Sequence, residues 1–177
     1  IRDMKLTPES LLAYLDKSSV DLFENLKVFS SVELHARCQV DMQSYISEIQ
    51  IESRTLGDMS LNHIIPTAIR YQNILIKNVK GIKEIFGEKF KSRANDQLII
   101  LEEISDHIKK IINGVDQMVL ARKNANKIED VNKKAMAYAK TVIPYLNEIR
   151  DHCDKLELTI DDSIWPLAKY RELLFIR

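Results

Sequence analysis

The sequence has little of what interrupts helices. Its 177 residues include only four glycines and four prolines, too few for a chain of many short strands joined by turns. Aromatic residues make up 7%, whereas Leu, Ile, Lys, Glu and Ala are plentiful. These features argue against an all-β chain and predict an all-α fold.

The sequence also lacks an excess of either charge and any long apolar run. Lys plus Arg and Asp plus Glu both total 26, so there is no basic footprint of a nucleic-acid-binding protein. No apolar run approaches the roughly 20 residues that a membrane helix needs. We therefore expect neither a nucleic-acid partner nor a membrane partner. Hydrophobic residues at 45% and charged residues at 29% are typical of a globular domain.

Cysteine is scarce too. Cys38 and Cys153 lie far apart and form no CxxC motif, so we expect buried, reduced thiols and a cytoplasmic location. The chain begins at Ile1 rather than at a methionine, as a fragment of a longer protein would.

Helix boundary signals divide the chain. Thr7 is predicted to cap a first short helix, with Pro8 as its first residue, and a second short helix follows. Together they predict an N-terminal arm over residues 1–30. Ser30 and Glu33 have the spacing of a capping box, and Gly87 stands where a C-cap glycine belongs. Between them we expect one very long helix, or two in tandem, kinked near Pro66.

Two later segments repeat apolar residues at spacings of three and four. Their apolar positions are Leu101, Ile104, Ile108, Ile111, Val115 and Met118, then Ile128, Val131, Ala135, Tyr138, Val142, Tyr145, Ile149 and Leu156. This period and the short connections near 87–91 and 123–127 predict an antiparallel bundle of three long helices over residues 31–158. We expect residues 159–177 to form a C-terminal docking tail, in which Pro166 disfavours a helical conformation at Trp165 and so predicts extended backbone there. We expect one compact domain overall.

Two glutamate–histidine pairs raise the question of a metal site. Glu103 with His107, and Glu148 with His152, lie four residues apart and so share a helix face. The Glu-x-x-His spacing of di-iron or di-manganese bundles is missing, because no histidine has a glutamate three positions before it. The sequence therefore predicts no metal ligands.

Nucleophilic catalysis finds no better support. His35 and Cys38 can face each other, but Cys38 shares the apolar phase of a core face, and adjacent His152 and Cys153 diverge by about 100°. There is no glycine-rich phosphate loop, GxSxG or HExxH motif. Asp161 and Asp162, which could serve acid–base chemistry, are expected to cap a helix instead.

The stretch DMSLNHIIPTAIRYQ, residues 58–72, gathers polar side chains around a proline. Pro66 donates no backbone hydrogen bond and clashes with the carbonyl of Asn62. Nearby polar side chains or water can satisfy the freed carbonyl, and we expect Arg70 and Tyr71 to pair with acids of a neighbouring helix. We interpret the stretch as a packed kink, and we expect no catalytic or cofactor-binding residue in this chain.

Two stretches carry a family resemblance. The run IQIESRTLGDMSLNHIIPTAIRYQNILIKNVKGIKEIFG and the ending DHCDKLELTIDDSIWPLAKYRELLF resemble the C-terminal region of bacterial type III glutamine synthetases. The intervening residues and the opening MKLTPESLLAYL fit as well, so the resemblance covers essentially the whole chain.

The resemblance implies a parent glutamate–ammonia ligase that makes glutamine through γ-glutamyl phosphate, with ATP and magnesium or manganese bound upstream of this fragment. It also implies a ring-shaped homo-oligomer, a dodecamer of two hexamers. The fragment is then an inactive structural or assembly domain whose partners are its own catalytic domain and neighbouring subunits. Ile64, Ile65, Ile69 and the Trp165–Phe175 tail are its expected docking residues. A free-standing helical-bundle interaction module is the alternative, and a metal-dependent bundle enzyme is a more distant one.

Overall fold

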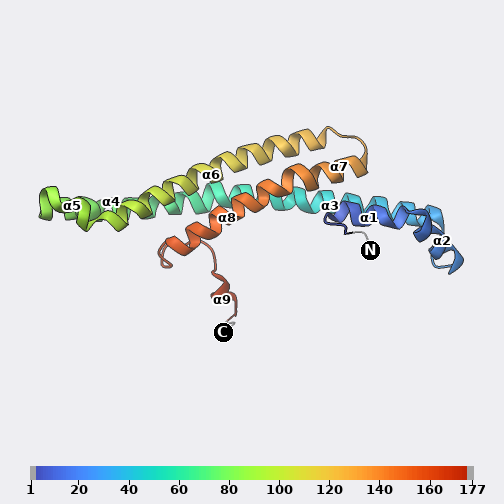
Figure 1. Ribbon diagram of the computed structural model, residues 1–177, viewed down its shortest axis with the longest axis horizontal. Helices are drawn as coiled ribbons and strands as arrows, with labels where there is room; N and C mark the ends of the chain where they lie inside the picture. The colour runs from blue at the N-terminus through green and yellow to red at the C-terminus, as the bar shows by residue number, and fades with distance from the viewer. Residues whose placement is uncertain (1–2, 175–177) are drawn as a thin grey trace. The chain divides into compact units, whose positions relative to one another are not determined.

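The computed structural model describes residues 3–174, and every regular element among them is helical (Figure 1). The all-α prediction is therefore confirmed. The α-helices, in chain order, are α1 (Thr7–Leu12), α2 (Lys17–Asn25), α3 (Ser31–Met59), α4 (Ile65–Phe86), α5 (Phe90–Arg93), α6 (Asn95–Asn126), α7 (Val131–Ala137), α8 (Ile143–Thr159) and α9 (Tyr170–Leu174). Among the residues described, no helix is long and apolar enough to cross a membrane.

Local sequence signals set several helix ends. The Ser30 N–H donates to Glu33 Oε2 at 2.8 Å and the Glu33 N–H donates to Ser30 Oγ at 3.3 Å, which confirms the capping box at the start of α3. Gly87 ends α4 with φ 54°, a backbone conformation that glycine adopts without strain. The predicted Thr7 cap is wrong. Leu6 is the N-cap residue of α1, because its extended backbone already supplies the carbonyl that accepts from Glu9 N–H.

Two prolines each follow a π-helical turn. Residues 60–64 form one such turn before Pro66, and residues 138–142 form the other before Pro144. A proline ring clashes with the carbonyl four residues earlier, here that of Asn62 or Lys140. A π-turn widens the backbone at that point, so it gives the ring room without ending the helix. The same local chemistry thus produces the same irregularity twice.

One compact unit comprises residues up to 55 together with 116–147. In α3 it buries Leu34, Cys38, Met42 and Ile46, which are spaced four apart on one helix face. The later segments contribute Met118, Ala125, Ala135, Tyr138, Val142 and Leu146. Full burial of a side chain such as Met42 contributes about 1.5–3 kcal/mol, so this face holds the unit together.

The second compact unit comprises residues 56–115 and those from 148 onward. Its core side chains come from α4, α6, α8 and the segments next to them. They are Ile64, Ile65, Ala68, Leu75, Ala94, Ile104, Ile111, Val115, Ile149, Cys153, Leu156 and Ile160. Within this unit α6 and α8 run in opposite directions, because His107 meets His152 whereas the later Gly114 meets the earlier Ile149.

Candidate functional site

The polar side chains around Pro66 do not converge on a pocket. Asn62, His63 and Arg70 are exposed, while the apolar Ile64 and Ile65 are buried in the second unit. The Asn62 amide donates to Asp58 Oδ1 at 2.5 Å, and the Arg70 guanidinium donates to Thr67 Oγ1 at 2.7 Å. These bonds stay within one turn of the chain, so they support the backbone near the π-turn, and Arg70 bonds to Thr67 rather than to an acid of a neighbouring helix.

The two glutamate–histidine pairs meet through their histidines. His107 on α6 and His152 on α8 lie with their Nδ1 atoms 3.1 Å apart, and the ring centroids are 5.1 Å apart. One ring must donate and the other accept, so a single proton lies between them. His152 is buried, with 8% of its surface exposed, and His107 is half-buried. The sequence placed each histidine on a helix face but gave no sign that the two faces met.

Charge and burial keep this pair neutral. Burial lowers the pKa of His107, and the neighbouring His152, Lys110 and Lys155 lower it further, while Glu103 opposes them. Burial likewise lowers the pKa of His152, with Lys110 and Lys155 acting in the same direction and Asp151 and Glu148 against.

The surroundings of the pair do not complete a metal centre. The Asp151 carboxylate lies 3.9 Å from His152 Nδ1, but it is already hydrogen-bonded by Lys155 Nζ at 2.6 Å. Across residues 3–174, no group of three or more His, Cys, Asp and Glu side chains is arranged to hold a metal ion. That the chain has no metal ligands stays a prediction.

Neither cysteine is poised as a nucleophile. Burial raises the pKa of Cys38, which contacts the Leu11 carbonyl, and His35 points instead to the Ser31 carbonyl. Burial also raises the pKa of Cys153, whose Sγ lies 3.6 Å from Ser60 Oγ. Both thiols are free and buried, as the sequence predicted. A raised pKa leaves little thiolate at neutral pH, so acyl or redox chemistry has no starting group here.

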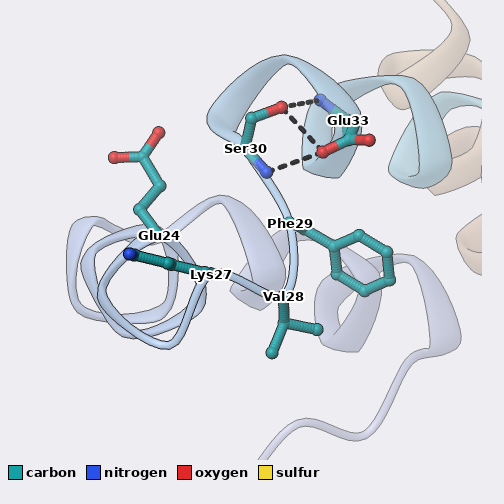
Figure 2. Close-up of a pocket in the computed structure, with 6 residues that line it drawn as sticks. All are labelled: Glu24, Lys27, Val28, Phe29, Ser30 and Glu33. Atoms are coloured by element: carbon teal, nitrogen blue, oxygen red, sulfur yellow. Dashed lines mark hydrogen bonds between the residues drawn. The ribbon is translucent and has the colours of Figure 1, made fainter.

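An open pocket of about 270 Å³ lies at the connection between α2 and α3 (Figure 2). Its polar lining includes Ser30 and Glu33, whose mutual hydrogen bonds are those of the capping box. These bonds, chiefly the one from the Ser30 N–H, lower the pKa of Glu33, so the carboxylate is fixed in its charged, accepting form. The pocket therefore offers a structural cap rather than an acid or base.

A second pocket of about 200 Å³ lies next to the first and has an aromatic lining. Phe23 and Phe29 stack at 5.9 Å between ring centroids, and the Arg37 guanidinium lies 4.4 Å from the Phe29 ring centroid. This arrangement attaches the short helices of the arm to α3 by aromatic and cation–π contacts. Asp41 completes the polar rim beside Cys38, and burial, together with the Asp41 charge, raises the pKa of that thiol.

Asp161 and Asp162 follow α8 and do not cap a helix as predicted. Asp161 accepts a hydrogen bond from the Ser163 N–H at 2.8 Å and so closes a turn instead of capping a helix. Asp162 pairs with Lys169, whose Nζ also donates to the Glu157 carbonyl at 3.0 Å. These bonds hold the irregular segment of turns and bends around Trp165 against the end of α8. Phe175, at the end of the predicted docking tail, lies outside the described residues.

A polar cluster around the buried Tyr138 in the first unit was not predicted from the sequence. Tyr138, which has no exposed surface, donates to Asn126 Oδ1 at 2.7 Å and accepts from Gln50 Nε2 at 2.9 Å. Nearby, Arg122 donates to the buried Ser53 Oγ at 3.2 Å. The partners are as much as 88 residues apart, so only Tyr138, on its apolar face, was predicted to be buried. The polar atoms of these side chains therefore bond to one another and hold the segments of the first unit together.

Comparison with known proteins finds similarity to glutamine synthetases in each case. The family model for the glutamine synthetase C-terminal domain matches residues 1–83. A glutamine synthetase of Bacteroides fragilis is 46% identical over 171 residues, which are 96% of this chain and 24% of that protein. A type-3 glutamine synthetase of Dictyostelium discoideum is 28% identical over 178 residues, and a glutamine synthetase of Butyrivibrio fibrisolvens is 21% identical over 173. The chain spans about a quarter of the length of these relatives.

Proposed function

The chain belongs to the glutamine synthetase C-terminal domain family, and we propose that it is a structural and assembly domain that braces the catalytic part of a type III enzyme. The observation that carries this proposal is coverage. Nearly all of this chain aligns with only a quarter of each relative, so the family's catalytic part lies in sequence that this chain does not contain.

The parent protein, in this proposal, is a cytoplasmic ATP-dependent ligase that joins glutamate and ammonia. Its nucleotide and its magnesium or manganese ions bind upstream of this chain. Its subunits assemble into a homo-oligomer, which we propose is a dodecamer. The chain's own residues provide no step of that reaction. The histidine pair, the capping box and the Tyr138 cluster all use their polar atoms within the fold, which supports a bracing role.

The detailed architecture is part of the same proposal. Residues 1–30 form an arm, residues 31–158 an antiparallel bundle of three long helices kinked near Pro66, and residues 159–177 a docking tail. The π-turn before Pro66 supports a change of helix direction there, because it disturbs the regular hydrogen-bond pattern. Ile69, which is 46% exposed, and the half-buried Trp165 remain available for contact with the catalytic part.

Truncation tests this function. A full-length type III synthetase and a version ending before the residue equivalent to Ile1 are compared by sedimentation velocity and by glutamine formation. The proposal predicts a smaller or heterogeneous assembly and reduced turnover for the truncated enzyme. Normal assembly together with normal turnover would rule the proposal out. The 177-residue chain alone is expected to show no γ-glutamyl transfer.

A further inference from the structure

The α4–α6 hairpin of the second unit extends beyond α8. Gln72 of α4 donates to Ser105 Oγ of α6 at 2.8 Å, and His107 of α6 meets His152 of α8, which sets the register of the three segments. Since α8 ends at Thr159 and runs opposite to α6, it reaches only to about residue 100 of α6. Figure 1 shows the hairpin, with α5 at its end, continuing past the end of α8. We name residues 74–99 the hairpin tip.

The hairpin tip exposes several large apolar side chains. Their exposed fractions are 53% for Ile74, 40% for Ile76, 76% for Ile85, 47% for Phe86, 38% for Leu98 and 46% for Ile99. Single exposed apolar residues are ordinary, but six on one hairpin end suggest a contact surface. Away from the tip, α8 packs against α6 as a third helix, where His152 meets His107.

The hairpin tip is also strongly basic. Residues 77–93 contain six basic and two acidic side chains, a net charge of +4. The six basic side chains are all exposed: Lys77, Lys80, Lys83, Lys89, Lys91 and Arg93. None of them belongs to an ion pair that the structure records. Lys83 and Arg93 lie over aromatic rings instead, 5.5 Å from the Phe90 centroid and 5.7 Å from the Phe86 centroid.

A glycine lies within the exposed stripe of α4. Ile74, Gly81 and Ile85 are spaced seven and four apart, so they share one helix face. A methyl group added at Gly81 would meet no atom within 4 Å, so nothing in this chain requires glycine at that position. Glycine in a helix interior lowers helix stability, but it lets a second helix approach closely.

The end of α8 carries the complementary features. Within α8, residues 148–159 contain four acidic and two basic side chains, a net charge of −2. Leu158, 86% exposed, is the most exposed large apolar residue in the part of the chain that the structure describes. Asp151 and Asp154 lie seven and four residues before it on the same face, together with Lys155, which pairs with Asp151 at 2.6 Å across two half-exposed side chains. The Asp154–Arg150 pair, at 3.8 Å, has both side chains mostly exposed, so it exchanges at little cost.

We propose that the hairpin tip of one copy docks on the acidic face of α8 in a second copy, with Leu158 seated along the Ile74–Gly81–Ile85 stripe. Opposite net charges favour this pairing, whereas two basic tips repel each other. The contact joins two different surfaces and is therefore head-to-tail, the type that builds rings or filaments. The inference deepens the proposed assembly role and rests on it for its biological setting.

Charge-swapped variants of the 177-residue chain test the proposal by sedimentation velocity. At about 50 mM salt the chain is expected to self-associate, and at about 500 mM it should dissociate, because screening weakens exposed charge pairs. The double variants Lys77→Glu/Lys80→Glu and Asp151→Lys/Asp154→Lys should each weaken association about tenfold or more. Mixing the two variants should restore it, because the reversed charges then complement each other.

Matched variants separate docking from folding. Lys123→Glu/Lys127→Glu changes two exposed lysines of the first unit and should leave association unchanged. Gly81→Ala should raise the unfolding midpoint yet weaken association, a combination that a folding defect cannot produce. A monomer at low salt, or association that charge reversal of the tip leaves unchanged or strengthens, would overturn the proposal. Should the chain be monomeric while truncation of the full synthetase still disrupts assembly, the docking fails and the proposed function stands.

Discussion

His107 Nδ1 lies 3.1 Å from His152 Nδ1, across the contact between α6 and α8. Two neutral imidazoles at this distance can share one proton, and a further proton on the accepting Nδ1 creates an imidazolium and leaves two N–H groups facing each other. Lys110 and Lys155 add to the positive potential, while Glu103, Glu148 and Asp151 offset part of it. The pair thus makes the stability of the second unit depend on pH.

The first prediction concerns that pH dependence. Burial lowers the pKa of both histidines below the ordinary value of about 6.5 in the folded chain. The unfolded chain therefore binds more protons below that pH. The contribution of the pair to the free energy of unfolding is complete above about pH 6.5 and is lost as the pH decreases below it. Urea unfolding between about pH 5 and pH 7.5 should show this loss.

Substitutions identify the groups responsible. His107→Gln or His152→Gln should flatten the profile in this pH window, whereas His35→Gln and His63→Gln, which alter exposed histidines, should leave it unchanged. Loss of stability confined to pH below about 4 would instead point to carboxylates such as Asp151, whose pKa the Lys155 hydrogen bond lowers. An equally steep profile in His107→Gln would contradict the account.

The second prediction contrasts two helical glycines. An alanine methyl at Gly114 would lie 2.9 Å from Ile149 Cγ1, and Ile149 is fully buried and cannot move aside freely. Overpacking costs about 1–3 kcal/mol and alanine restores about 1 kcal/mol of helix propensity. Gly114→Ala should therefore lose up to about 2 kcal/mol, whereas the open Gly81 should gain about 1 kcal/mol when replaced by alanine. Thermal unfolding distinguishes the two, and equal shifts would show that the packing at Gly114 is looser than described.

The third prediction concerns the buried tyrosine. Tyr138→Phe removes the hydroxyl that joins Gln50 and Asn126, so it should lower the free energy of unfolding by about 1–2 kcal/mol. Tyr145→Phe is the control, since Tyr145 lies on the same helical run but its hydroxyl has no recorded hydrogen bond. Chemical denaturation of the two variants should differ. If both lose the same amount, the cluster adds nothing beyond ring packing.

The fourth prediction tests the capping box. Ser30→Ala removes the acceptor for the Glu33 N–H and should cost about 1 kcal/mol of stability. Ser47→Ala is a matched control, because Ser47 is exposed in the middle of α3 and bonds only to the Gln43 carbonyl. Fluorescence-detected urea unfolding of both variants provides the comparison. A Ser30→Ala variant as stable as Ser47→Ala would mean that the start of α3 is held by the aromatic contacts of the arm alone.

Local chemistry was readable from the sequence. The Ser30–Glu33 spacing and Gly87 correctly predicted the start of α3 and the end of α4, because caps depend on residues a few positions apart. Apolar spacing likewise predicted the burial of Ile104 and Ile149, whereas Tyr145, which was placed on the same apolar face, is half-exposed. Each of these predictions depended only on residues close together in the sequence.

Long-range pairing was not readable. The histidine pair joins residues 45 apart and the Gln50–Tyr138 bond joins residues 88 apart, so neither follows from spacing within one helix. The Thr7 cap failed for a different reason. Threonine has the right side chain, but α1 begins one residue earlier than that reading required, with Leu6 as its cap. A periodic pattern predicts which face of a helix is buried, but it does not predict which other helix packs on that face.

The most direct test of the assembly role is complementation between separate chains. A type III synthetase truncated before the residue equivalent to Ile1 is mixed with the purified 177-residue chain, and the masses of the complexes are measured by mass photometry. The account predicts that the chain binds the truncated enzyme and restores the mass of the intact oligomer. A truncated enzyme that already has the full number of subunits and does not bind the chain would contradict it.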